Sequence, residues 1–477
     1  MTEPPPAVQE TFEQLQDEKD GYLQLRNISG GWYVQHATSV WDKEEKKPKK
    51  VTTHLGAISD DGEFTPKTPQ EAIPELNREI FEYANGQLAY SLIEDVRGPL
   101  SEHTARTDEL IAMAIIQAID PKPIRLHKDR WETLYLSQEH DVRMDRNHLT
   151  DVLEAIGQGK GWWYDFFETI QDDGFLLYDL STVFTHSQSI KRAEKGYNPE
   201  EKNQPQIGTV LAFSTASGLP VGVDVFWGSM HDIQTFKEFL DLADPSDVGY
   251  IVDKGLVSEE LIRDFSEAGI SYVAPLKSDS NHIDLRWLNW STFTYRDRSL
   301  RYARRHPDED HLGICYIFED PMLKAEQEQA LHRRKAEGEI TQEKYDEQME
   351  RAGIIAFLSD LDEDGSVIYE LYKERHEVEL AFGAMKSQLD ADKTHLQSDE
   401  AVRGYFFMIF LALRIYFKVL TRLREEGLTS EISVEEVFFK LSKVERIIGP
   451  GEKDSFAKIP EQAREIAELF PDALPRV

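Results

Sequence analysis

The segment Phe175–Ser181, with the sequence FLLYDLS, decides how the rest of the chain is interpreted. It is a short apolar run that follows Gly174, and it predicts a buried strand with Asp179 near its end. The segment Gly249–Gly255, GYIVDKG, repeats the pattern with Asp253. Adjacent strand ends in one sheet are rigid and close together, so the two segments predict a sheet that presents two carboxylates.

The segments around these two strands predict the remainder of an α/β core. Two further strands, Gly208–Thr215 and Leu219–Trp227, and a helix at about Asp232–Ala243 lie between them. A helix at about Ser258–Ala268 and a strand at Ser271–Leu276 follow. The order of three strands, helix, strand, helix and strand predicts a mixed sheet with flanking helices.

A third carboxylate comes from the segment Tyr372–Lys386, YKERHEVELAFGAMK, which is rich in helix formers and lacks proline, and which predicts one helix. One face of that helix would carry Tyr372, Arg375, Glu379, Phe382 and Lys386. A carboxylate between two cations suits a metal ion bound to a phosphodiester. The alternative is an exposed helix in which Arg375 and Glu379 form an ordinary i,i+4 pair, worth a few tenths of a kcal/mol.

Asp179, Asp253 and Glu379 together would suit a two-metal phosphodiester site. Two divalent cations about 3.5–4 Å apart can activate the attacking oxygen and stabilise the leaving one. Without cations, three packed carboxylates would repel one another and take up protons. Each aspartate alone could instead cap the turn after its strand.

The charge of the chain argues against a nucleic-acid partner. Its 54 Lys and Arg stand against 88 Asp and Glu, which gives a formal net charge of −34. Phosphate affinity comes from Lys and Arg, so either the partner is not a nucleic acid, or the acidic excess is a surface adaptation to high salt that leaves local basic patches. The single cysteine, Cys315, excludes an internal disulfide and a cysteine-based zinc site.

The sequence predicts an intracellular protein that does not enter a membrane. Its first residues lack the basic and apolar regions of a signal peptide. The most apolar run, Tyr405–Leu420, is interrupted by Arg414 and is shorter than a membrane span, which predicts a buried helix.

The N-terminal part is expected to begin with a polar lead-in over residues 1–20. Short strands should follow from Gly21 to about Gly62, with a charged hairpin tip at Trp41–Lys50 whose lysines are a candidate phosphate-contacting loop. Residues from about 69 to 170, including Glu79–Tyr83, are expected to be helical. A second basic cluster there, Arg125, His127, Lys128 and Arg130, would suit either a DNA-binding module or a packing domain.

The 126 positions between Asp253 and Glu379 exceed what one helix and one strand need, which predicts an inserted domain at about Lys277–Arg351. Its first half has strand-like aromatic segments with Trp287 and Trp290, and its second half predicts a charged helical hairpin around Gly338. The strongest basic run of the chain lies in the first half and consists of Arg296, Arg298, Arg301, Arg304 and Arg305.

The spacing Tyr372-x2-Arg375-x3-Glu379-x6-Lys386, with the two upstream aspartates, resembles the motif of the DDE transposases of prokaryotic insertion sequences, whose catalytic core is ribonuclease H-like. The segment Gly208–Trp227 is similar to the strand pair of that family. The family usually has Asp-Arg-Gly at the second aspartate, so Lys254 is a departure that keeps the cation. The resemblance implies a ribonuclease H-like mixed sheet with flanking helices, interrupted by a β-rich insertion domain and preceded by a small N-terminal β and helical region.

For function, the resemblance implies metal-dependent cleavage of DNA at the ends of the element, followed by strand transfer into target DNA. Asp179, Asp253 and Glu379 would hold two Mg²⁺ ions, with Mn²⁺ as a substitute. The expected DNA contacts are Tyr372, Arg375, Lys386, Lys254, Trp287, Trp290, Arg298, Arg301, Arg304 and Arg305. One of the two tryptophans would stack on a base displaced from the transposon end, although both would also suit the core of a small sheet. The expected partners are terminal inverted repeats, target DNA and a second copy of the chain, in the nucleoid of a prokaryotic cytoplasm.

The expected domains are an N-terminal β-rich segment, a helical region that binds DNA, a catalytic core in two parts around the insertion, and a C-terminal helical tail. The N-terminal β-rich segment is expected at 1–65 and the helical region at 66–170. The catalytic core is expected at 171–276 and 354–425, with the insertion at 277–353 between its two parts. The C-terminal helical tail is expected at 426–477. Two alternatives remain open: a ribonuclease H-like nuclease without strand transfer, and a catalytically inactive DNA-binding protein derived from a transposase. A protein that does not bind nucleic acid would fit the net charge but leave the helix motif unexplained.

Overall fold

The computed structural model divides into two compact units, Met1–Arg78 and Glu79–Val477. It describes residues 4–18, 22–28, 30–42, 47–67, 78–172, 174–185, 194–195, 205–227, 249–252, 257–306, 313–389, 393–394, 396–449 and 454–474.

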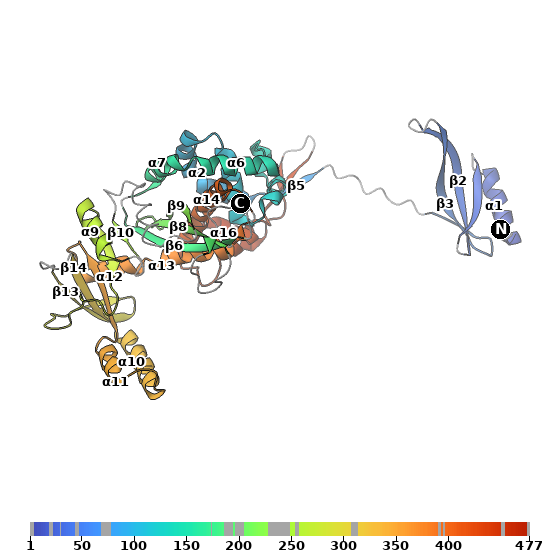
Figure 1. The fold of residues 1–477 in the computed structure, drawn as a ribbon. Coiled ribbons are helices and arrows are strands. Elements are labelled where there is room, and N and C mark those ends of the chain that lie inside the picture. Colours follow the sequence, from blue (N-terminus) through green and yellow to red (C-terminus); the bar gives the residue numbers. More distant parts are fainter. Residues whose placement is uncertain are drawn as a thin grey trace. The chain divides into compact units, whose positions relative to one another are not determined.

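The first unit is a four-stranded antiparallel sheet with one helix on one of its faces (Figure 1). Its elements are α1 (Pro6–Glu18), β1 (Leu23–Ile28), β2 (Gly31–Asp42), β3 (Lys47–Ile58) and β4 (Phe64–Pro66). The expectation of a polar lead-in was wrong, because Val8, Phe12 and Leu15 recur at helical spacing and are buried in the core of the unit. Thr11 Oγ1 also donates a hydrogen bond of 2.7 Å to the carbonyl of Gly62 and so ties α1 to the turn before β4.

The strands β2 and β3 form the predicted hairpin. Their pairing extends as far as Asp42 opposite Lys47, so the tip lies where the sequence placed it. Residues 43–46 of the tip, with two of the lysines, lie outside the described residues.

The core of the second unit is an 11-stranded mixed sheet. Its strands are β6 (Leu176–Thr185), β7 (Glu194–Lys195), β8 (Pro205–Ser214), β9 (Pro220–Trp227), β10 (Tyr250–Ile251), β11 (Tyr272–Pro275), β12 (Ser291–Tyr295), β13 (Arg298–Arg305), β14 (Ile314–Glu319), β15 (Ile354–Ser359) and β16 (Lys393–Thr394). The central order is β9-β8-β6-β10-β11-β15. The strands β6, β8 and β9 pair antiparallel, whereas β10 is parallel to both β6 and β11. A strand occurs in each of the five predicted segments, but β6 continues to Thr185, so Asp179 lies within its strand and not near the end. Residues 253–255 of the second aspartate segment and the helix expected at Asp232–Ala243 lie outside the described residues.

Apolar side chains cover both faces of this sheet. Alternate residues of β6 divide between two clusters: Leu177 belongs to one, and Leu176 and Tyr178 belong to the other. The second cluster is covered by α9 (Glu259–Ala268), whose Phe265 is fully buried. The first is covered by helices that include α14 (Asp399–Glu425), which also packs on β9.

Helix α14 contains the apolar run that the sequence predicted to be a buried helix, and the structure confirms this. Arg414 is buried in it, and its guanidinium donates a hydrogen bond of 2.6 Å to the carbonyl of Pro220 and pairs with Asp95 at 3.4 Å. No helix in the described part of the chain is long and apolar enough to span a membrane.

The region before β6 is mainly helical, as expected. Its elements are β5 (Glu79–Glu82), α2 (Ala84–His103), α3 (Thr107–Ile119), η1 (Ile124–Leu126), α4 (His127–Glu132), α5 (Leu136–Glu139), α6 (Arg146–Gln158) and α7 (Lys160–Ile170). The helical expectation for Glu79–Tyr83 was wrong. Residues 79–82 form the strand β5, because β17 (Glu445–Ile448) near the other end of the chain supplies its backbone partners.

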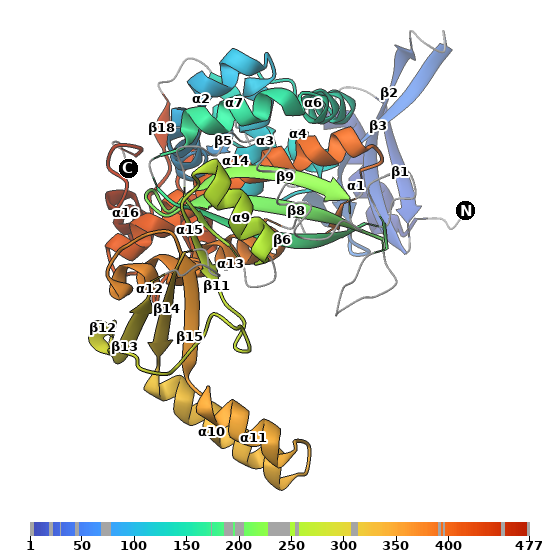
Figure 2. The same cartoon turned by 60° about the vertical axis from the view of Figure 1, so that its left-hand side comes forward.

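The inserted region adds strands to the same sheet and then forms a helical hairpin. Strands β12, β13 and β14 continue the sheet outward from β15. Helices α10 (Pro321–Ala336) and α11 (Gln342–Glu350) lie side by side (Figure 2), with Gly338 at a φ of +75° between them, so the predicted hairpin is confirmed. The C-terminal part adds α15 (Val434–Leu441), β18 (Ser455–Phe456) and α16 (Glu461–Glu468).

Candidate active site

The described parts of the two aspartate segments include neighbouring parallel strands, β6 and β10. In the register of β6 and β10, Leu177 is opposite Ile251. Two residues beyond Leu177, the backbone of Asp179 pairs with Leu211 of β8. Asp253, the residue two positions beyond Ile251, lies outside the described residues, and so does Lys254.

The segment Tyr372–Lys386 is not one helix, which corrects the sequence prediction. Helix α12 (Gly365–Lys373) ends before Glu374, helix α13 (His376–Gly383) begins after Arg375, and a π-helical turn (Ala384–Gln388) follows. At the junction, the amides of Glu377 and Val378 donate to carbonyls three residues earlier, at 2.8 and 3.1 Å, which tightens the chain. The π turn is closed by a bond of 2.9 Å from the amide of Leu389 to the carbonyl of Ala384.

Despite this break, three residues of the motif lie together. Arg375 pairs with Glu379 at 3.1 Å, and its Nη1 donates to the hydroxyl of Tyr372 at 3.3 Å. The ring of Tyr372 packs on Phe357 of β15, with the centroids 4.3 Å apart. His376, which the sequence analysis did not select, lies 3.5 Å from the other oxygen of Glu379. Its i,i+3 spacing from Glu379 was the available signal.

Helix α13 holds Glu379 over the central strands. It packs against β6 and β8 through Val378, Ala381 and Phe382, which belong to the same apolar cluster as Leu177 and Ile251. The side chain of Glu379 is half exposed. Lys386 lies in the π turn after the buried Met385.

The two tryptophans of the inserted region have different environments. Trp287 is 99% exposed and has a φ of +58°. Trp290 packs against an apolar cluster, and the guanidinium of Arg301 lies 4.4 Å from its ring centroid. Only Trp287 therefore presents its whole ring to a ligand.

The loop that carries Trp287 is held by charged groups. Arg305 pairs with Asp284 at 2.9 Å and donates to the carbonyl of Arg286 at 2.8 Å. Arg286 also pairs with Asp284 at 2.9 Å, and hydrogen bonds from its side chain and backbone hold the pKa of Asp284 well below its usual range. These contacts fix the residues that precede Trp287.

Four of the five arginines in the basic run have carboxylate partners. The pairs are Arg298–Asp320 at 3.3 Å, Arg301–Glu319 at 2.9 Å, Arg304–Asp362 at 2.7 Å and Arg305–Asp284 at 2.9 Å. Arg296 lies over the ring of Tyr295, 5.4 Å from its centroid. The charge of the run is thus partly compensated in this structure, and its DNA contacts stay a prediction.

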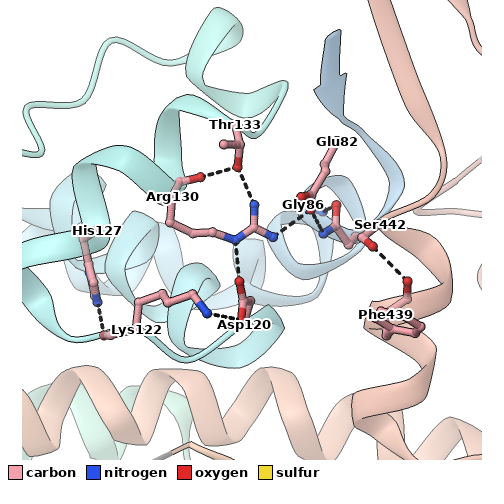
Figure 3. Close-up of polar contacts among 10 residues, drawn as sticks. Glu82, Gly86, Asp120, Lys122, His127, Arg130, Thr133, Phe439 and Ser442 are labelled. Carbon is pink, nitrogen blue, oxygen red and sulfur yellow. Dashed lines mark hydrogen bonds and ion pairs between the residues drawn. The ribbon is translucent and has the colours of Figure 1, made fainter.

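Two of the four residues of the second basic cluster, Arg130 and His127, are built into the packing of the helical region (Figure 3). Arg130 is only 10% exposed and pairs with Glu82 at 2.7 Å and with Asp120 at 3.0 Å. His127 is buried, its Nε2 lies 2.9 Å from the carbonyl of Lys122, and burial lowers its pKa to about 4. For these two residues the structure favours the packing alternative. Arg125 and Lys128 are exposed.

A metal site can be tested only against the described side chains. Among these, which do not include the side chains of Asp179 and Asp253, no three His, Cys, Asp or Glu residues gather closely enough to hold a metal ion. The carboxylate of Glu379 is the predicted ligand that the structure describes, and it is accessible.

The chain belongs to the family of transposases with a DDE domain. The family model of the transposase DDE domain matches residues 170–415, which is more than half of the chain and includes all three predicted carboxylates. A solved structure that matches is a piggyBac transposase synaptic complex with hairpin DNA, at 12% identity and a TM-score of 0.38, over 75% of this chain and 78% of that chain. A search of curated proteins gives no significant match.

Proposed function

We propose that this protein is an active transposase that cuts DNA at the ends of its element and joins the freed 3′-hydroxyls to target DNA. Family membership supports the class of protein. The assignment of Asp179, Asp253 and Glu379 as the catalytic carboxylates rests on one observation, the parallel register of β6 and β10.

That register pairs Leu177 with Ile251. Asp179 and Asp253 each lie two residues further along their strands, so continuation of the register would make them neighbours. Side chains alternate between the faces of a sheet, so continuation of both strands would put positions 179 and 253 on the face of Leu177 and Ile251. Helix α13, which carries Glu379, packs on that same face. The three carboxylates would then converge from two strands and one helix.

The strand order supports a ribonuclease H-like core. Three antiparallel strands in the order β9-β8-β6 are followed by β10 and β11, which run parallel to β6. Helices cover both faces of these strands. In this order β6, which contains Asp179, lies beside β10, which precedes Asp253 in the chain.

The donor set suits Mg²⁺ or Mn²⁺, which prefer carboxylate oxygens. Two such ions would supply activation of the attacking hydroxyl and stabilisation of the leaving oxygen. The chain's own groups would position the DNA. Arg375 now neutralises Glu379, and its fork of donors also matches a phosphate. The Tyr372 hydroxyl accepts from Arg375 and orients the guanidinium.

The remaining predicted contacts complete the proposal. Lys254 and Lys386 would contact phosphates near the scissile bond, and Trp287 would stack on an unpaired base. Trp290 is the less favoured of the two tryptophans for stacking, because one face of its ring already packs on the guanidinium of Arg301. Because insertion-sequence ends are cut as a pair, we also propose a homodimer on DNA, acting in the cytoplasm of a prokaryote.

The test is cleavage of labelled DNA that carries the terminal repeats flanking the gene, with Mg²⁺, by wild type and by Glu379→Gln. The variant should bind DNA and not cut it, because an amide keeps the shape but loses the charge that holds a cation. Glu377→Gln is a matched control on the same helix, since Glu377 pairs with Arg424 at 2.7 Å. It should cut like wild type.

Other outcomes separate the alternatives. Binding without cleavage by wild type would indicate an inactive derivative, and cleavage without joining would indicate a nuclease. Cleavage by Glu379→Gln at the wild-type rate would contradict the assignment of Glu379.

A further inference from the structure

The first unit contains a sheet with one covered and one open face. Helix α1 covers the first face, where Trp32, Val34 and Ile58 are buried against Val8 and Phe12. In the described part of the unit, α1 is the only helix (Figure 1). The side chains that alternate with the buried ones therefore lie on a face without a second layer.

Strand register identifies the residues of this open face. Gln24, Gln35 and His54 lie opposite one another across β1, β2 and β3, and Arg26 lies opposite Tyr33. The rings of Tyr33 and His54 are 5.4 Å apart. These five residues alternate with core residues such as Leu23 and Val34, which places them on the face opposite α1.

One lysine side chain lies across the same face. Lys50 lies on β3, and its Nζ donates a hydrogen bond of 2.9 Å to Oε1 of Gln24 on β1. Because β2 lies between those strands, the lysine side chain must cross the open face. Arg26 and Lys50 are both exposed.

The charge of these strands is opposite to that of the whole chain. In the chain, 88 of 477 residues are acidic. Strands β1, β2 and β3 contain one acidic residue, Asp42, which is next to the hairpin tip. They contain four cations, Arg26, Lys47, Lys49 and Lys50. Of the four, Arg26 and Lys50 lie on the open face by register, together with the amides of Gln24 and Gln35 and the rings of Tyr33 and His54. No carboxylate is among the described side chains of this face.

We propose that this open face binds duplex DNA and forms a second contact with the substrate, separate from the catalytic sheet. The identity of the ligand rests on the proposed function, and the location rests on the geometry above. The major groove of B-form DNA admits a β-ribbon, and Gln, Arg, His and Lys provide donors for base edges and phosphates. Double-stranded RNA fits less well, because its major groove is deep and narrow.

The geometry assigns different roles to the two parts of the face. Arg26 and Lys50 neutralise phosphates and provide affinity that depends on salt. Gln35 lies at the centre of the face, between Gln24 and His54, where an amide can read the edge of a base. Loss of the cations should therefore weaken binding to all sequences, whereas loss of Gln35 should change the preference among sequences.

The experiment measures binding of the full chain to fluorescent 40-base-pair duplexes at several salt concentrations. One duplex carries the terminal repeat that flanks the gene, and the other has a mixed sequence. The double variant Arg26→Ala/Lys50→Ala should have an affinity for both duplexes that is lower than that of wild type by about tenfold or more. It should reduce the slope of log affinity against log salt by about 2, because each phosphate contact contributes about 0.9. Lys67→Ala, which removes an exposed cation after β4, is the control and should leave both quantities unchanged.

A second variant tests readout without a change of charge. Gln35→Ala should reduce the preference for the repeat over the mixed duplex by about tenfold. Unfolding midpoints of all variants should equal that of wild type, since the substituted side chains are not part of the apolar core of the unit.

Unchanged affinity and salt slope in the double variant would overturn the proposal. Loss of self-association in sedimentation, with DNA affinity retained, would show that the face binds a second copy of the chain and would also overturn it. Failure of the proposed function would give a different result. If the protein were a catalytically inactive derivative, it would not cut DNA, but substitution of Arg26 and Lys50 would still weaken its DNA binding. A wild-type protein that binds neither duplex at any salt concentration would refute both.

Discussion

Replacing Trp287 by alanine should weaken DNA binding and leave the stability of the protein unchanged. The side chain is 99% exposed, so its removal leaves no cavity. The φ of +58° is equally unfavourable for tryptophan and alanine, so the backbone gains nothing from the change. The free energy of unfolding should therefore stay within about 0.5 kcal/mol of wild type.

The effect on DNA binding follows from the exposed ring. Stacking on an unpaired base contributes about 1–3 kcal/mol, which corresponds to an affinity between about 5-fold and 150-fold lower in the variant. The assay is titration with duplexes that contain a fluorescent base analogue at each position near the cleavage site. Wild type should quench one position strongly, and Trp287→Ala should not.

Trp290→Ala is the matched control, because its ring packs beside an apolar cluster and over Arg301. It should lower the free energy of unfolding by about 1–3 kcal/mol and retain the quenching. Equal affinity and equal quenching for wild type and Trp287→Ala would refute the stacking role. Loss of quenching in Trp290→Ala, but not in Trp287→Ala, would show that Trp290 is the tryptophan that stacks on the base.

Three further predictions concern stability. His127 is neutral in the fold because burial lowers its pKa to about 4 from 6.5, so its stabilising contribution is complete above pH 6.5 and is lost as pH falls toward 4. Unfolding by urea should show a loss of about 3 kcal/mol over this range in wild type relative to His127→Gln, and parallel pH profiles would contradict this. Arg130→Met should cost about 2–3 kcal/mol, measured by the same method, because it removes the buried cation that Glu82 and Asp120 share and leaves them only Asn85 and Lys122 as side-chain partners. With a net charge of −34, the protein should unfold at a higher temperature in 2 M than in 0.1 M KCl, and full stability and DNA binding in dilute buffer would count against salt adaptation.

The central strands could be predicted because their signal is local. The segments that became β6 and β10 are short apolar runs, and burial on both faces of the sheet explains why they lack polar alternation. The helical hairpin around Gly338 is predictable for the same reason, since its charges recur at helical spacing.

What the sequence missed depends on partners that are distant along the chain. Arg304 finds Asp362, 58 residues away, so a run that looks basic in sequence is partly neutral in the fold. The strand β5 exists because β17 pairs with it. The break between α12 and α13 follows from a local change in hydrogen bonding, and no proline or glycine marks it in the sequence.

The central claim is that positions 179, 253 and 379 share bound cations. Iron-directed cleavage tests it most directly: Fe²⁺ replaces Mg²⁺ on the DNA-bound protein, and peroxide then cuts the backbone close to the metal. The account predicts three sets of cuts, near Asp179, Asp253 and Glu379, which disappear when excess Mg²⁺ is added. Cuts confined to other segments, or the absence of one of the three sets, would contradict it.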